Sequence, residues 1–256
     1  MILSTPGVEQ LPTPGLILDK HPPIHYYHPM PYRRTVLAND EIYHVFNRGV
    51  ARLPIFSSNK NYLRFLDLID YYRFKNTPIS FSHLQKLTKE EREKIMDYLS
   101  NEEKTQVEIL AFCLMENHFH FLLKQKLENG ISKFISNLQN GYAKYFNIKT
   151  DRTGPLFQPM FKSVRVITDE QLLHVSRYIH LNPSTGFLVE IADLENFPWS
   201  SLSRYIPEGD SSYSFVDTTV VLGLMGNQGK SKYKEFVFNQ AEYQKELGKI
   251  KHLILE

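Results

Sequence analysis

Cysteine is scarce in this chain of 256 residues, which contains only one, Cys113. One cysteine cannot form an intrachain disulfide or a cysteine-based zinc site, which is typical of proteins in a reducing compartment. No apolar run approaches the about 20 residues that span a bilayer, and the first residues lack the basic-then-apolar pattern of a signal peptide. We therefore expect a cytoplasmic protein with no membrane partner.

A strong excess of one charge is also missing, because 30 lysines and arginines stand against 28 aspartates and glutamates. A net charge of +2 does not by itself indicate nucleic acid as a partner. The distribution is less even than the total, since residues 110–168 hold eight basic and three acidic side chains. This local excess suits a polyanion, and a solvated basic face is the alternative.

Proline is concentrated at the start, where residues 1–32 hold seven of the fourteen prolines. We read residues 1–40 as a proline-rich N-terminal arm. Beyond it, apolar patterns predict strands at 42–46, 107–115, 118–124 and 161–167, and helices at 62–74, 130–147 and 169–182. The last helix should end at Asn182 because a proline follows it.

This order predicts an α+β fold with a ferredoxin-like β-α-β-β-α-β core, in which an antiparallel sheet has helices on one face. The core and the helix that follows it occupy residues 41–185. Residues 76–104 differ from their surroundings and read as an inserted helical segment, with a capping box formed by Thr88 and Glu91. Residues 186–256 form a C-terminal extension that is partly helical.

The central motif is His118-Phe119-His120, inside one of the predicted strands. Side chains alternate along a strand, so both histidines face one side and Phe119 faces the other. Two imidazoles at a spacing set by the strand can bind a divalent metal. The alternative is a pair of strand histidines with no ligand role.

A row on the last predicted helix supplies candidate partners, because His174, Tyr178 and Asn182 are spaced four residues apart. An oxygen or nitrogen from this row would complete a mixed site that suits Mg²⁺ or Mn²⁺ when a phosphate also coordinates. A phenol, with a pKa of about 10, becomes a nucleophile beside a metal-polarised phosphodiester. Tyr178 is then the candidate nucleophile, and an ordinary structural tyrosine is the alternative.

Several motifs, in this order, resemble the REP-associated tyrosine transposases, a group of the single-tyrosine HUH transposases of insertion sequences. They span residues 33–205 and comprise Tyr43-His44-Val45, Asn47-Arg48-Gly49, Met115 to His120, Phe157-Gln158, Lys162-Ser163, Tyr178 to Pro183 and Pro198 to Ser201.

The resemblance implies a role for each matching position. His118 and His120 match the metal-binding pair, Asn182 the third ligand, and Tyr178 the nucleophile that joins a 5′ phosphate. It also implies Mg²⁺ or Mn²⁺ as cofactor and single-stranded DNA with hairpins, at REP-like palindromes or element ends, as substrate. The protein is then expected in the bacterial cytoplasm, associated with the nucleoid, and a homodimer is one assembly that the resemblance allows.

Phosphate contacts are expected from basic residues on and near the predicted core: Arg48, Arg52, Lys124, Lys126, Lys162, Arg165 and Arg177. Such contacts supply affinity and salt sensitivity without reading sequence. Two other functions stay open, a regulator that binds DNA hairpins without cutting them and a metal-dependent hydrolase that uses water. The four intact site positions argue against a loss of the chemistry.

Overall fold

The computed structural model describes residues 36–101, 105–209 and 212–239. Residues 33–256 form one compact unit apart from residues 1–32, and all described residues belong to that larger unit. Its sheet contains β1 (Ile42–Arg48), β2 (Val107–Met115), β3 (His118–Gln125) and β4 (Lys162–Val166). The strand order is β2-β3-β1-β4 and every neighbouring pair is antiparallel. The fold is therefore α+β, with a four-stranded antiparallel sheet among the described residues.

The helices lie between the strands and after the last of them: α1 (Asn59–Tyr72), α2 (Phe81–Leu84), α3 (Lys89–Asn101), α4 (Gly130–Lys149), α5 (Asp169–Thr185), α6 (Leu202–Tyr205), α7 (Thr219–Gly223) and α8 (Gly229–Phe238). Two 3₁₀ turns, η1 (Val50–Arg52) and η2 (Ile191–Asn196), complete the described elements. The predicted order of strands and helices is confirmed, and α2 and α3 lie between α1 and β2, where the sequence predicted a helical segment. No described helix is long and apolar enough to cross a bilayer.

The end of α5 differs from the prediction, which stopped this helix at Asn182. The helix continues through Pro183 to Thr185. Two carbonyls of its last turn still find donors, since the Gly186 N–H donates to the Asn182 oxygen at 2.8 Å and the Leu188 N–H donates to the Pro183 oxygen at 2.9 Å. Burial from Leu172 to Pro183 stabilises the turn further, so packing overrides the local effect of proline.

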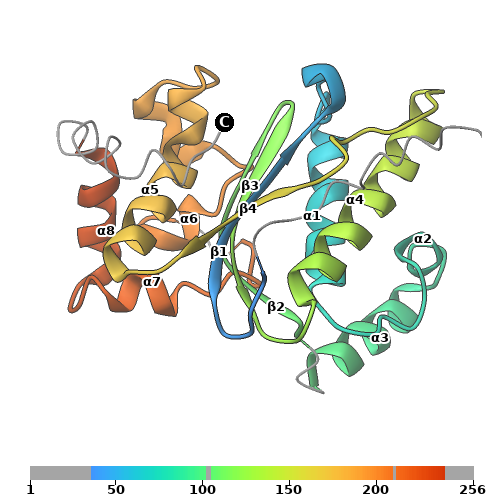
Figure 1. The fold of residues 1–256 in the computed structure, drawn as a ribbon, viewed down its shortest axis with the longest axis horizontal. Coiled ribbons are helices and arrows are strands. Elements are labelled where there is room, and N and C mark those ends of the chain that lie inside the picture. Colours follow the sequence, from blue (N-terminus) through green and yellow to red (C-terminus); the bar gives the residue numbers. More distant parts are fainter. Residues whose placement is uncertain (1–35, 102–104, 210–211, 240–256) are drawn as a thin grey trace, which may run out of the picture. The chain divides into compact units, whose positions relative to one another are not determined.

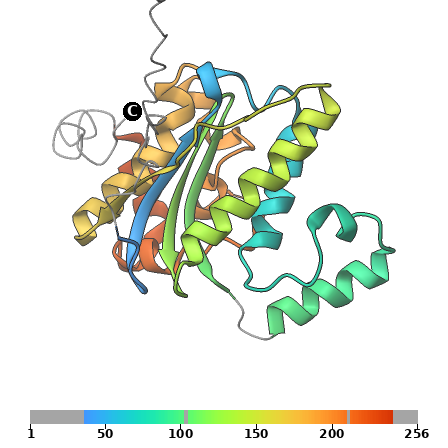
Figure 2. The same cartoon turned by 45° about the vertical axis from the view of Figure 1, so that its right-hand side comes forward.

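Helices cover both faces of the sheet, where the sequence predicted one (Figures 1 and 2). α1 and α4 pack together on one face, and α5 packs on β2 and β3 from the other. The second layer was missed because α5 is held by α7, α8 and η2 of the C-terminal extension.

The face under α1 and α4 forms the aromatic part of the core. Phe119 is fully buried, with its ring centroid 5.4 Å from that of Phe65 and 5.9 Å from that of Phe157. Phe121 contacts Phe134 of α4 at 5.9 Å. These contacts confirm that the residue between the two histidines points away from them and anchors β3.

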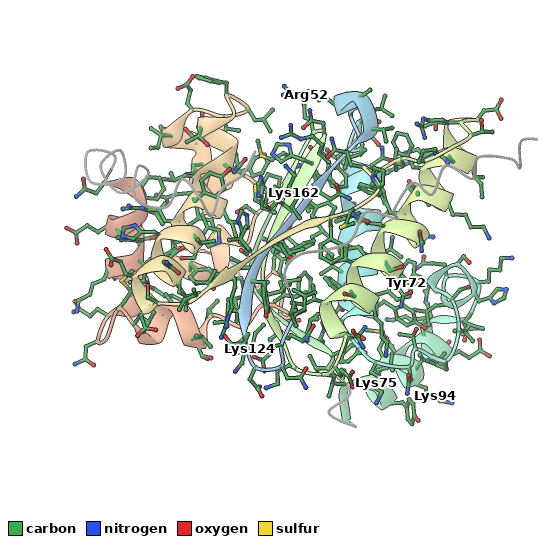
Figure 3. The ribbon with its side chains drawn as sticks, viewed as in Figure 1. Arg52, Tyr72, Lys75, Lys94, Lys124 and Lys162 are labelled. Atoms are coloured by element: carbon green, nitrogen blue, oxygen red, sulfur yellow. The ribbon has the colours of Figure 1, made fainter. Side chains whose placement is uncertain are left out.

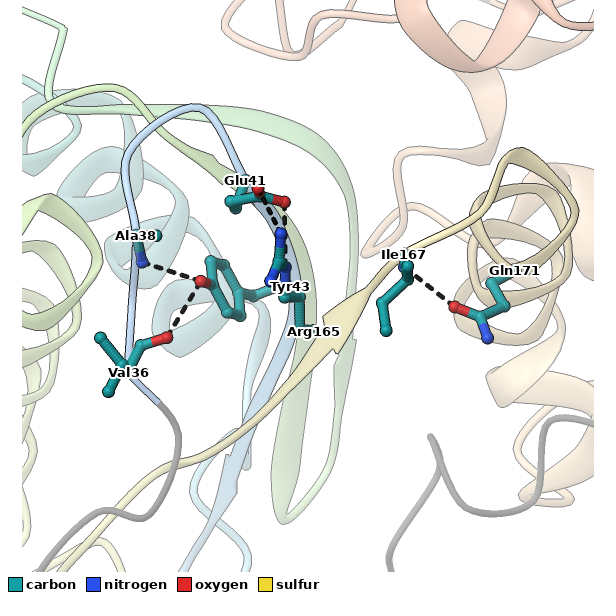
Figure 4. A network of polar contacts seen from close by, with 7 residues as sticks. All are labelled: Val36, Ala38, Glu41, Tyr43, Arg165, Ile167 and Gln171. Carbon is teal, nitrogen blue, oxygen red and sulfur yellow. Dashed lines mark hydrogen bonds and ion pairs between the residues drawn. The ribbon is translucent and has the colours of Figure 1, made fainter.

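Residues 36–40, the described end of the predicted arm, lie against the sheet. The Tyr43 hydroxyl donates to the Val36 oxygen at 3.1 Å and accepts from the Ala38 N–H at 2.8 Å (Figure 4). Gln125 also donates to the Leu37 oxygen at 2.8 Å. The rest of the predicted arm (1–35) and the end of the predicted extension (240–256) lie outside the described residues. The insertion at 76–104, which holds α2 and α3, stays a prediction.

A buried polar cluster fixes α5 to the C-terminal extension. His180 is fully buried, with Nδ1 2.7 Å from the Tyr233 hydroxyl and Nε2 2.7 Å from the Ser201 hydroxyl. The Tyr233 hydroxyl donates onward to Ser176 at 2.9 Å. Neutral histidine, with one donor and one acceptor, matches these two hydroxyls. Burial lowers the pKa of His180 to about 3.

This cluster predicts a loss of stability at acid pH. Between the ordinary histidine value near 6.5 and about 3, the unfolded chain binds a proton at His180 that the folded chain does not. Between pH 7 and pH 5 the wild type should therefore lose about 2 kcal/mol more unfolding free energy than His180→Gln. Urea unfolding at each pH measures the difference, and the exposed His83→Gln serves as the control. Equal losses in the wild type and His180→Gln would contradict the prediction.

Candidate active site

The sheet register places the histidine pair beside residues of β1. His120 pairs across the strands with Phe46, and His118 pairs with Arg48. Phe46 pairs on its other side with Lys162 of β4. Directly paired residues share a face of the sheet, so these five side chains project toward the face that α5 covers.

A cavity of about 70 Å³ lies in this group, with room for a few water-sized groups. Its lining combines the two histidines with cationic and amide side chains and one phenylalanine: Phe46, Asn47, Arg48, His118, His120, Gln158 and Lys162. Gln158 reaches this position because its N–H donates to the Arg48 oxygen at 2.9 Å, which extends the edge of β1. The cavity is therefore polar and positively charged.

Each imidazole of the pair is oriented through Nδ1. The Nδ1 of His118 is 2.6 Å from Oδ1 of Asn117, and the Nδ1 of His120 is 3.0 Å from Nε2 of His44. An amide oxygen only accepts, so the neutral His118 carries its proton on Nδ1 and a lone pair on Nε2. The Nε2 atoms of both histidines are buried.

This donor set fits a divalent cation that takes two imidazole nitrogens and oxygen ligands. Metal-bound histidines usually carry a hydrogen bond on the other ring nitrogen, as both do here. Among the described residues no group of three or more His, Cys, Asp or Glu side chains stands as a metal site would require. Amide and phosphate oxygens are ligands that Mg²⁺ and Mn²⁺ accept beside imidazole.

Tyr178 lies on the side of α5 that faces the sheet. Its ring stands edge-on to His120, with centroids 5.6 Å apart and planes at 89°. It makes a similar contact with His44 at 5.9 Å and 77°. The predicted nucleophile and the predicted metal pair therefore meet within one chain, although sixty residues separate them in the sequence.

The other two members of the predicted helix row differ in their surroundings. Asn182 is 4% exposed and lies one turn beyond Tyr178 on α5. His174 instead contacts α8, since its Nδ1 accepts from Arg177 at 3.0 Å and its ring lies 5.4 Å from that of Phe236. The C-terminal extension therefore engages His174, and Asn182 stays a predicted ligand.

Three of the predicted phosphate-contacting residues lie at the histidine end of the sheet. Arg48 and Lys162 line the cavity, and the exposed Arg52 lies in η1, where its carbonyl accepts from Asn117. The chain can turn tightly through η1 because Gly49 has no Cβ, which would lie 2.4 Å from the Leu53 oxygen. Figure 3 shows Arg52 and Lys162 near the same end of the sheet.

Three other predicted phosphate-contacting residues, Lys124, Lys126 and Arg165, lie away from this end of the sheet or on its opposite face. Lys124 lies six residues along β3 from His118, about 20 Å away at the strand rise, and Figure 3 places it at the far end. Lys124 and Lys126 both face Glu108, at 4.0 Å and 3.0 Å. Arg165 pairs with Tyr43 across the strands, so it projects from the opposite face, where its Nε donates to Glu41 at 3.0 Å (Figure 4).

Arg177, the remaining predicted phosphate contact, lies against α8. This side chain is fully buried and its guanidinium carbon lies 3.9 Å over the ring of Phe236. It also donates to the Phe236 oxygen at 3.0 Å. A basic residue on an amphipathic helix reads as solvent-facing unless another element covers it, and α8 covers this one.

His44 is the site residue that the sequence reasoning missed. The sequence placed His44 only within the motif Tyr43-His44-Val45 and gave it no role. In the structure it is fully buried and contacts both His120 and Tyr178. Side-chain alternation could have predicted its position, because His44, Phe46 and Arg48 share one face of β1.

A sheet that carries two histidines on one strand, under a helix that brings a tyrosine to them, defines a candidate tyrosine–histidine active site. Residues 81–182 match the family model described as "Transposase IS200 like". Over these residues the chain therefore matches an IS200-like transposase domain, which confirms the predicted family at that level. The matched residues begin after β1, although β1 lies between β3 and β4 in the sheet.

Two further comparisons were made. A search of curated proteins found no match. A solved structure described as "Structure of the REP associates tyrosine transposase bound to a REP hairpin" is similar with a TM-score of 0.46 and 13% identity, over 69% of this chain and 85% of that one.

Proposed function

We propose that this protein is a transposase of the REP-associated tyrosine type. It cleaves and rejoins single-stranded DNA that carries hairpins, through a 5′-phosphotyrosine intermediate. The observation that carries the proposal is the edge-to-face contact between Tyr178 and His120, 5.6 Å between centroids, beside a cavity lined by His118, Arg48 and Lys162. The ferredoxin-like arrangement of the core and the motifs shared with this group support the substrate class, which would be met at the bacterial nucleoid.

His118 and His120 would hold a Mg²⁺ or Mn²⁺ ion through Nε2, with the amide oxygen of Asn182 as the proposed third protein ligand. When bound, the ion supplies positive charge that polarises the scissile phosphate. Arg48 and Lys162 add fixed positive charge at the same cavity and orient the phosphate.

Tyr178 provides the nucleophile. Its phenolic oxygen forms a bond to phosphorus while the bond from phosphorus to the 3′ oxygen breaks, so the 5′ phosphate stays on the protein. The phenol loses its proton and the departing 3′ oxygen gains one, which leaves a 3′ hydroxyl. Attack by a 3′ hydroxyl on the phosphotyrosine reverses these changes and rejoins a strand.

Incubation with labelled single strands tests this function directly. Strands with and without a hairpin are incubated with Mn²⁺ and separated on a denaturing gel. We expect a labelled band at the mass of the protein and a free fragment that ends in a 3′ hydroxyl. Binding without cleavage would instead support the hairpin-binding regulator, and cleavage without a covalent band would support the hydrolase.

The position of the basic residues predicts which of them contact DNA. Arg48→Gln and Lys162→Gln should each weaken single-strand binding and lower the slope of log affinity against log salt by about 0.7. Lys126→Gln should leave the slope nearly unchanged, because this residue already pairs with Glu108 at 3.0 Å. Fluorescence anisotropy over a salt series measures the slopes. An equal fall in all three variants would contradict the assignment.

The contact between Tyr178 and His120 in one chain predicts a site completed without a partner subunit. A mixture of Tyr178→Phe and His120→Ala proteins should therefore stay inactive, even after joint refolding. In a homodimer that exchanges α5, some mixed dimers would contain one intact site. Recovered cleavage in the mixture would show that sites are shared.

A further inference from the structure

His44 is a buried histidine that has no role in the chemistry proposed above. It is fully buried on β1, and its Nε2 lies 3.0 Å from the Nδ1 of His120. The two rings are nearly parallel, with centroids 5.2 Å apart and planes at 18°. A hydrogen bond therefore joins the middle of β1 to one of the two candidate metal ligands.

Aromatic neighbours hold both rings in this position. Phe46 stacks on His44 at 4.9 Å and on His120 at 5.5 Å. Tyr178 also contacts both rings in T-shaped arrangements, at 5.9 Å and 5.6 Å between centroids. The hydrogen bond between the imidazoles is thus part of a packed cluster.

Only one proton lies between two neutral imidazoles at this distance, and its position decides what His120 can do. If the proton is on His44 Nε2, His120 carries its own proton on Nε2 and cannot bind a metal there. If it is on His120 Nδ1, the Nε2 of His120 has a free lone pair. The state that binds a cation is therefore the one in which His44 accepts.

We propose that His44 is a positioning residue for the metal site: it accepts the Nδ1–H of His120 and presents the Nε2 lone pair to the cation. This inference rests on the proposed function, because it requires His118 and His120 to hold a cation. Asn117 does the same for His118 with an oxygen at 2.6 Å. Each ligand then has its own acceptor, and one of the two acceptors is a second histidine.

Two substitutions separate the acceptor from the packing. His44→Phe keeps a ring of similar size between Phe46 and Tyr178 and removes the acceptor. His44→Gln places an amide oxygen near the position of Nε2 and keeps an acceptor. Loss of a hydrogen bond to a metal-bound histidine typically weakens metal binding about 10- to 100-fold. We expect that loss for His44→Phe and near wild-type binding for His44→Gln.

The experiment is a Mn²⁺ titration of the DNA-free protein, in which the electron paramagnetic resonance signal of free Mn²⁺ reports how much of the ion is bound. Wild type, His44→Phe, His44→Gln and His118→Ala are compared, and circular dichroism checks that each is folded. If His118→Ala loses binding and His44→Phe does not, this inference is wrong and the metal site stands. If the wild type binds no Mn²⁺, or His118→Ala binds as tightly as the wild type, the proposed metal site itself is wrong.

A measurement on the unmodified protein makes the test independent of folding defects. Long-range ¹H–¹⁵N spectra of the Mg²⁺-loaded wild type report which ring nitrogens carry protons. We expect a protonated Nδ1 on His120 and an unprotonated Nε2 on His44. A protonated Nε2 on His44 in the loaded protein would overturn the inference.

Discussion

Tyr178→Phe should abolish the covalent protein–DNA adduct and reduce strand cleavage at least about 1000-fold. The substitution removes one oxygen and keeps the ring, so the contacts with His44 and His120 remain and α5 stays in place. The adduct is measured on denaturing gels after incubation with labelled hairpin strands and Mn²⁺. Binding to the same strands should persist, because the basic side chains at the cavity are unchanged.

Tyr145→Phe is the matched control for this substitution. Like Tyr178, Tyr145 lies on a helix, but it is half-buried and lies on α4 at the opposite face of the sheet. Its hydroxyl is 3.4 Å from Oδ1 of Asn61. Its removal should leave adduct formation unchanged. An adduct that survives in Tyr178→Phe would show that another residue is the nucleophile, and mass spectrometry of the joined peptide would identify it.

His118→Ala should lower Mn²⁺-dependent cleavage at least about 100-fold, or about 2.7 kcal/mol of transition-state stabilisation, with hairpin binding retained. His118 is the better test of the pair because it is only partly buried, whereas His120 is fully buried and its loss would also leave a hole beside His44. Single-turnover cleavage across a Mn²⁺ series measures the effect.

The control for this prediction is His83→Ala, an exposed histidine on α2. It should cleave like the wild type at every Mn²⁺ concentration. Cleavage by His118→Ala at the wild-type rate, with the same dependence on Mn²⁺, would rule out the histidine pair as the metal site and leave Tyr178 to act without it.

The core of the fold could be predicted because its strands and helices carry strong local patterns. Apolar patterns placed β1, β2 and β3 within a few residues, and the apolar stripe of α4 placed that helix. Side-chain alternation along β3 is a local property as well. The same alternation put Phe119 on the core side of β3 and the two histidines on the other. These assignments depend only on neighbours in the chain.

The surroundings of the basic residues could not be predicted from local sequence patterns. Arg177 and Arg165 read from the sequence like Lys162, as cations on amphipathic elements. Only the packing of α8 buries Arg177, and only the strand register turns Arg165 to the opposite face and toward Glu41. Helix α5 continued past Asn182 for a related reason, because burial outweighed the local effect of Pro183.

The sequence by itself determined the order of strands and helices, the shared face of His118 and His120, and Tyr178 as their candidate partner, since period and motif spacing are local. The tertiary structure decided the contact of Tyr178 with His120 in one chain, the burial of Arg177 and the hydrogen bond from His44 to His120. Those features join residues that are 58 to 76 positions apart, and only the sheet register and the helix layer bring such residues together. The histidine pair was visible in the sequence, and its acceptor on β1 became visible only when the strands were paired.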